Sequence, residues 1–299
     1  MSFHRVIVAY DGSPRSQDAL ALALRLVDPA DGVLTLACVV SGRQWHVGAE
    51  VRRSDATVPD EIAGMFAHAR ATAIPAGVRV RERAPVAPSP ARGLTELAEA
   101  ESADLIVVGS SSHGDAGGIR LERTAGRLLQ GAPCAVAVAP GELRETDDFH
   151  HIAIAFDGSP ESRAAVAAGY AIAARSGAAV SLLYAVSVVD PEPLRRETRL
   201  AAEAALDEAA DEAPAGVNPR TVLLHGAAGD VIRHACEGIV DLLVTGSRGY
   251  GPLRRALLGS VSETLTEGAS HPVLIIPRPA PAPAAPRAIA AATETRSTP

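Results

Sequence analysis

A glycine-rich stretch late in the chain has residue types and a spacing suited to holding phosphate groups. It reads GSRGYGPLRRALLGS over residues 246–260 and precedes an apolar, helix-like run. Glycines let the backbone approach a phosphate and present N–H donors, and a helix start favours an anion. Arg248 can add a charge-assisted contact. The same pattern also fits a glycine turn and helix cap that bind nothing.

Two Asp-Gly-Ser sequences, residues 11–13 and 157–159, each follow a short apolar run. Open α/β sheets bind ligands at the carboxyl ends of strands where the strand order reverses, so Asp11 and Asp157 are candidates for contacts to a ribose or an adenine. An Asp that only shapes a turn explains the pattern equally well. The sequence leaves both interpretations open.

Other chemistries are excluded or unsupported. All 28 basic residues are Arg, which removes the Lys of a Walker A loop, of a protein kinase and of a pyridoxal enzyme. No GxSxG or HExxH sequence occurs, and the three cysteines lie far apart without metal-ligand spacing. We therefore predict no catalytic residues and no protein metal site.

The net charge and the hydropathy of the chain argue against two classes of partner, nucleic acids and membranes. The net charge of −7 and a pI near 5.7 argue against binding to nucleic acid or to an anionic membrane. No apolar stretch approaches the length of a membrane span, and the first residues do not resemble a secretory signal. We expect a cytoplasmic protein.

The chain repeats itself. HRVIVAYDGSP from His4 recurs as HIAIAFDGSP from His151, DLIVVGS recurs as DLLVTGS, and AVAVAP recurs as PVLIIP, always in the same order. This pattern indicates a tandem duplication. We predict a first domain over residues 1–140, a linker over 141–150, a second domain over 151–278 and a disordered Pro/Ala-rich tail over 279–299.

Each copy alternates apolar runs with helical patterns. The runs are apolar throughout, as in strands covered on both faces, and Ser13 and Ser159, each followed by Pro, are typical helix N-caps. The predicted fold is α/β, with five strands per copy in a doubly wound parallel sheet. The predicted strands lie near residues 5–10, 33–40, 77–82, 104–109, 134–139, 151–156, 179–186, 218–224, 241–246 and 272–277.

The pattern G-x2-G-x9-G-[ST], after a first strand that ends in Asp, resembles the ATP-binding branch of the universal stress protein family in its tandem, two-domain form. The resemblance covers both repeats and implies a strand order of 3-2-1-4-5 in each. It implies that Asp157 contacts the adenosine and that the backbone of Ala185 contacts the adenine. It also implies a phosphate and ribose site. The candidates there are Gly246, Arg248, Gly249, Gly259, Ser260 and the adjacent Val261.

The first copy departs from this pattern. It keeps Gly109, but Ser112 replaces the second glycine and Glu122-Arg123 replace the Gly-Ser pair. A carboxylate about 4 Å from a phosphate is repelled by ~1 kcal/mol in water and ~4 kcal/mol at an effective dielectric of 20. Asp11 and Val39 remain as weaker adenosine-type candidates with Gly109. We predict a degenerate first site, a competent second one and one ATP per chain.

The resulting hypothesis is a cytoplasmic, ATP-binding stress or signalling protein that is not a dedicated enzyme. Mg²⁺ would accompany the triphosphate, and any hydrolysis would be slow. The resemblance also suggests association through the fifth strands, either between the two copies or between chains as a homodimer. The alternatives are an interaction module that has lost nucleotide binding and a nucleotidyl-transfer enzyme, which would need basic catalytic residues and an acceptor domain.

Overall fold

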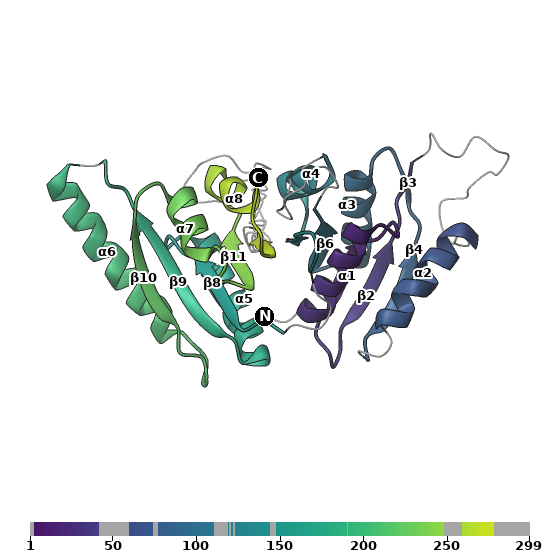
Figure 1. The fold of residues 1–299 in the computed structure, drawn as a ribbon, viewed down its shortest axis with the longest axis horizontal. Helices are drawn as coiled ribbons and strands as arrows, with labels where there is room; N and C mark the ends of the chain where they lie inside the picture. The colour runs from purple at the N-terminus through teal and green to yellow at the C-terminus, as the bar shows by residue number, and fades with distance from the viewer. Residues whose placement is uncertain are drawn as a thin grey trace, which may run out of the picture.

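The structure, a computed structural model, describes most of both copies. The described residues are 3–41, 60–73, 77–110, 119, 121, 123–143, 148–189, 191–247 and 259–277. Within them, the two halves of the chain form one molecule in which a single long sheet runs through both copies (Figure 1).

The described part of the first copy contains seven strands and four helices. In chain order they are β1 Arg5–Ala9, α1 Pro14–Leu26, β2 Val33–Ala37, β3 Val40–Ser41, α2 Asp60–Ala73, β4 Arg79–Arg83, β5 Val86–Ala87, α3 Pro90–Glu101, β6 Leu105–Gly109, α4 Arg123–Gly131 and β7 Ala135–Ala139. The very short strands β3 and β5, which the sequence did not predict, pair with each other as a separate small sheet.

The described part of the second copy repeats the plan with five strands and four helices. They are β8 His151–Ala155, α5 Pro160–Ser176, β9 Ala179–Val186, α6 Glu192–Asp211, β10 Arg220–His225, α7 Ala228–Cys236, β11 Leu242–Gly246, α8 Ser260–Thr266 and β12 Val273–Ile276. As predicted, Ser13 and Ser159 cap α1 and α5: each side chain accepts a hydrogen bond from the backbone N–H three residues on.

Both copies have the predicted strand order. The sheet reads β10-β9-β8-β11-β12-β7-β6-β1-β2-β4, which is 3-2-1-4-5 in the second copy followed by 5-4-1-2-3 in the first. All neighbouring strands within a copy are parallel. The α/β, doubly wound class is therefore confirmed for each copy.

The two fifth strands join the copies. β12 pairs with β7 in antiparallel register, Val273 opposite Val138 and Ile275 opposite Val136. Since β12 also pairs with β11 and β7 with β6, both fifth strands have partners on both sides. The between-copies form of fifth-strand association is thus the one observed, and it leaves neither strand an open edge for a second chain.

Helices cover both faces of this sheet (Figure 1). One face packs against α1, α2, α5 and α6, and its buried cluster contains residues of both copies, such as Leu22 and Leu206. The other face packs against α3, α4, α7 and α8, with Leu128 and Leu265 in its cluster. Each core therefore continues across the domain boundary. No described helix has both the length and the apolar composition needed to cross a bilayer.

The prediction that all strands are apolar throughout is wrong for the two edge strands. β4 reads RVRER and alternates between exposed and half-buried positions, and β10 is exposed or half-buried along its length. Charges on β4 pair with the covering helices: Glu82 with Arg70 at 3.1 Å and Arg83 with Glu101 at 2.7 Å. Charged edge strands of this kind oppose sheet-to-sheet association.

The described parts of the predicted linker are packed rather than free. The backbone N–H groups of Glu142 and Leu143 donate to the Asp18 carboxylate on α1 at 3.3 and 2.9 Å. Phe149 is buried, and the Arg25 guanidinium lies 5.8 Å from its ring centroid. These contacts fasten the connection to α1.

Candidate functional site

Three of the predicted site residues lie at the ends of adjacent parallel strands in the second copy. Asp157 follows β8, Ala185 lies near the end of β9, and Gly246 ends β11. β8 is the central one, with β9 on one side and β11 on the other. The chain therefore reverses its direction of travel across the sheet at β8, which is where open α/β sheets bind ligands.

Asp157 shapes the turn that leads from β8 into α5. One of its carboxylate oxygens accepts a hydrogen bond from the Ser159 N–H at 3.0 Å, and Gly158 has a left-handed φ of +79°. Asp157 is only half-buried, so its second oxygen is not enclosed by the core. The turn interpretation is therefore realised, and among the described residues it engages one of the two carboxylate oxygens.

The first copy builds the same turn. Asp11 accepts from the Ser13 N–H at 3.0 Å, and Gly12 also has a φ of +79°. Burial pushes the pKa of Asp11 upward, but hydrogen bonds from Ser13 and Ser16 outweigh it and hold that pKa below its ordinary value. The carboxylate stays charged at neutral pH, as a turn acceptor must.

The glycine that ends the fourth strand has a packing function in both copies. A Cβ on Gly246 would lie 2.9 Å from the backbone of Glu161 at the start of α5. A Cβ on Gly109 would lie 2.1 Å from the carbonyl oxygen of Arg15 at the start of α1. Close approach of strand to helix thus requires glycine at both positions, whether or not a phosphate is bound.

The start of α8 is fastened to the end of β11. Gly259 is the helix N-cap, and its N–H donates to the Ser247 carbonyl at 2.9 Å. Ser262 donates from its hydroxyl to the Gly246 carbonyl at 2.7 Å. These bonds bring the two ends of the glycine-rich stretch together at the same edge of the sheet.

Ser262 is a positioning residue that the sequence reasoning missed. It is buried, in contrast to Ser260 and Val261, which are exposed at the start of α8. Its position in the first copy is held by Ala125, which has no hydroxyl. That difference between the copies was the available signal. Arg248 and Gly249, the remaining candidates, lie outside the described residues.

The weaker candidates of the first copy do not line the concavity that is formed by described residues of this copy. The γ-carbons of Val39 pack against α3, where a Cβ on Gly93 would lie 2.7 Å away. Ser112 and Glu122, the substitutions predicted to spoil the first site, lie outside the described residues. A concavity of ≈ 370 Å³ is found elsewhere in this copy, between α3 and α4, and none of Asp11, Val39 and Gly109 lines it.

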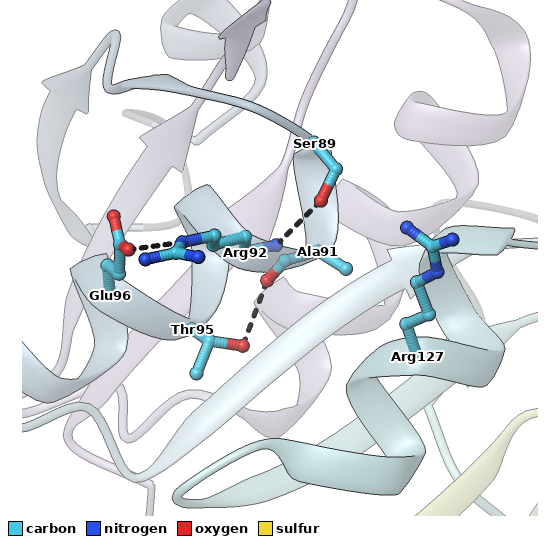
Figure 2. A pocket seen from close by; sticks show the side chains of 6 residues that line it. All are labelled: Ser89, Ala91, Arg92, Thr95, Glu96 and Arg127. Atoms are coloured by element: carbon cyan, nitrogen blue, oxygen red, sulfur yellow. Dashed lines mark hydrogen bonds and ion pairs between the residues drawn. The ribbon is translucent and has the colours of Figure 1, made fainter.

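That concavity has a mixed lining. Figure 2 shows the Arg92 guanidinium turned toward Glu96, which it contacts at 2.7 Å, while Arg127 extends from α4 on the other side. Ser89 accepts a hydrogen bond from the Arg92 N–H as the N-cap of α3, and Thr95 donates to the Ala91 carbonyl. Most of its polar groups therefore already have partners within α3.

A profile for the universal stress protein family matches residues 2–140 and again residues 148–277. The two matches cover most of the chain and correspond to its two copies. The chain belongs to the universal stress protein family.

Individual relatives in the universal stress protein family agree with this. A universal stress protein of Mycobacterium tuberculosis is 28% identical over 183 residues, 58% of this chain, and the match spans only 61% of that relative's length. Universal stress protein YxiE of Bacillus subtilis is 31% identical over 146 residues, 43% of this chain and 99% of the relative.

Among solved structures, a universal stress protein from Archaeoglobus fulgidus superposes with a TM-score of 0.65 at 17% identity. The superposition covers 92% of this chain and 98% of the other. At this identity it demonstrates a shared fold and no more.

The described residues of this universal stress protein contain no group of three or more His, Cys, Asp or Glu side chains that could hold a metal ion. The three cysteines are free thiols, with Cys134 and Cys236 buried. Burial raises the pKa of each of these two thiols to about 12, so neither is a nucleophile at neutral pH.

Proposed function

We propose that this universal stress protein binds ATP in its second domain and acts as a cytoplasmic, nucleotide-responsive stress or signalling protein rather than as an enzyme. The observation that carries the proposal is the convergence at one edge of the sheet. Asp157, Ala185 and Gly246 end three adjacent strands, and hydrogen bonds draw the start of α8 to the same edge.

The residues present fit a nucleotide polyphosphate. Gly259 carries no side chain at the start of α8, and the first turn of that helix, like those of α6 and α7 but unlike those of α1, α3 and α5, has no side-chain cap. The exposed hydroxyl of Ser260 adds a donor beside it. Asp157 would hold the adenosine, Ala185 would supply backbone groups for the adenine, and Arg248 and Gly249 would join the phosphate contacts. Mg²⁺ would be held by the phosphate oxygens and water.

The proposal is tested on the full chain with Mg-ATP by isothermal titration calorimetry. We expect about one ATP per chain. Gly259→Glu copies the residue of the first copy, Glu122, onto the second. It should reduce affinity at least about fivefold, because it sets a carboxylate against the phosphates and ~1–4 kcal/mol of repulsion corresponds to roughly five- to a thousandfold.

The matched control is Gly131→Glu, which adds the same charge at an exposed glycine with open space around it at the end of α4. It should leave ATP affinity unchanged. If Gly259→Glu and Gly131→Glu bind ATP equally, the phosphates lie elsewhere. If the wild-type chain binds no ATP, the interaction module becomes the better hypothesis.

A further inference from the structure

Two residues of the first copy form hydrogen bonds with the carboxyl end of α8. The Ile119 N–H donates to the Ala269 carbonyl at 2.8 Å, and the Ile119 carbonyl accepts from the Gly268 N–H at 2.7 Å. The Leu121 N–H donates to the Glu267 carboxylate at 2.7 Å. We call these five residues the clasp. It links the two copies through three hydrogen bonds that are independent of the β7–β12 pairing.

The Ile119 side chain adds apolar burial to the clasp. It is fully buried, and it belongs to the cluster that contains Leu128 of the first copy and Ile232 and Leu265 of the second. Ile119 is therefore an anchor between the copies rather than a surface loop residue.

The antiparallel joint explains why these segments meet. With Val273 opposite Val138, the start of β12 lies beside the carboxyl end of β7. The turn between α8 and β12 is thereby brought to the edge of the first copy where its own ligand would bind. In repeat register, Ile119 and Leu121 correspond to residues 256 and 258 of the glycine-rich stretch. The first copy uses this stretch to hold its neighbour.

Helix α8 connects the clasp to the proposed phosphate contacts. Its seven residues span about 10 Å at 1.5 Å per residue. Its start is tied to β11 through Gly259 and Ser262, and Leu265 and Thr266 near its end are fully buried. A helix this short behaves as a rigid body. A displacement of its carboxyl end, at the clasp, therefore also displaces its amino end, at Gly259 and Ser260.

We infer that the first domain regulates nucleotide affinity in the second domain through this clasp. The inference rests on the proposed function. A closed clasp holds Gly259 and Ser260 in the binding arrangement, so that ATP does not have to order them. Because coupling between two sites is reciprocal, bound ATP must strengthen the clasp by the same factor.

Two variants open the clasp in different ways. Ile119→Ala removes the buried anchor and should weaken ATP binding about tenfold. Glu267→Ala removes only the acceptor for Leu121 and should weaken ATP binding about fivefold, the lower end of typical coupling factors. Glu267 is exposed, so this second variant tests the inference without removing a buried side chain from the core.

Each variant has a matched control. Leu94→Ala truncates a fully buried side chain of the same cluster on α3, and Glu99→Ala removes an exposed carboxylate from the same helix, outside α8 and the clasp. Both controls should bind ATP as the wild type does. Hydrogen exchange supplies the reciprocal measurement: ATP should slow exchange of the Ile119 and Gly268 amides at least threefold in the wild type and not in Gly259→Glu.

The outcomes separate the two proposals. Weaker binding in both clasp variants, with unchanged controls and ATP-dependent protection of the clasp amides, supports regulation by the first domain. If the wild type binds ATP, but Ile119→Ala and Glu267→Ala bind it as tightly as their controls, the regulatory inference is overturned and the proposed function stands. If the wild type binds no ATP, both are overturned.

Discussion

The two copies share their fold and differ at the edge where each would bind a ligand. Both have the 3-2-1-4-5 strand order, the Asp turn with a left-handed glycine, and a glycine that ends the fourth strand. Gly109 is retained in a copy that has lost the rest of the motif, because its missing Cβ makes room for α1. Such residues indicate the fold. They support a nucleotide site only together with the start of α8, which hydrogen bonds hold at the same edge.

The residues that differ are more informative. Where the second copy has Gly259, Ser260 and Ser262, the first has Glu122, Arg123 and Ala125. The intervening stretch of the first copy instead supplies Ile119 to the clasp. Duplication thus allowed one copy to specialise in supporting the other, while the requirements of strand–helix packing stayed the same in both.

The largest effect is expected from the fourth-strand glycines. Gly109→Ala places a Cβ 2.1 Å from a backbone carbonyl, and Gly246→Ala places one 2.9 Å from backbone. The first should lower the free energy of unfolding by about 3 kcal/mol and the second by about 1 kcal/mol, the range of overpacking costs. Urea denaturation measures both.

Gly126→Ala in α4 is the control for adding a methyl group. Its nearest neighbour would be 3.6 Å away, and Ala is preferred over Gly in a helix by about 1 kcal/mol. This control should be neutral or stabilising. Equal losses for Gly109→Ala and Gly246→Ala would mean that the closer contact in the first copy is relieved by backbone movement.

The next effect concerns pH and the residue that precedes the fifth strand. His271 of the second copy and Cys134 of the first are equivalent in the repeat, and both are buried. Among the described residues, neither ring nitrogen of His271 has a hydrogen-bond partner. Burial lowers the pKa of His271 to about 4, against a small upward contribution from Glu237. The folded protein therefore keeps this ring neutral.

The sign follows from the depressed pKa. In the unfolded chain His271 takes up a proton near pH 6.5, and in the folded chain it does so near pH 4. The contribution of the neutral His271 to the free energy of unfolding is therefore complete above pH 6.5 and is lost as the pH falls toward 4. The loss should reach about 3 kcal/mol. His271→Cys, which copies the first domain, should remove this part of the slope in urea midpoints between pH 7 and 4. An unchanged slope would show that other groups cause it.

The sequence predicted the central strands well, but it did not predict that the edge strands would be charged and partly exposed. β1, β6 and β11 were placed within one or two residues, because a strand covered on both faces must be apolar throughout. β4 and β10 broke that rule because an edge strand can expose its side chains and can carry charge. Periodicity within one segment carries no information about which strand will be at the edge.

The candidate site was partly accessible for the same reason. The topology rule located Asp157 and Gly246 at one edge, and the structure agrees. Ser262 was missed because its role depends on the β11 carbonyl it faces, and Ile119 because its partner belongs to the other copy. The role of Ile119 becomes visible only once the antiparallel register between β7 and β12 is known.

The smallest effect is expected at a third contact between the copies, between α5 and α1. The Arg175 guanidinium, at the end of α5, donates to the carbonyls of Arg25, Leu26 and Val27 at the end of α1. A cation at a helix carboxyl end also favours the helix dipole. The first copy has Pro29 at the equivalent position and cannot reciprocate.

Because the Arg175 side chain is partly open to solvent, Arg175→Ala should cost only about 1 kcal/mol in urea denaturation. Arg199→Ala removes an exposed arginine whose partner Glu203 lies one turn along the same helix, and it should cost less than about 0.5 kcal/mol. If the two variants lose the same stability, the α1–α5 contact contributes nothing to joining the copies. The β7–β12 pairing and the clasp would then have to hold them together, and Ile119→Ala would separate the domains more readily than its buried area alone implies.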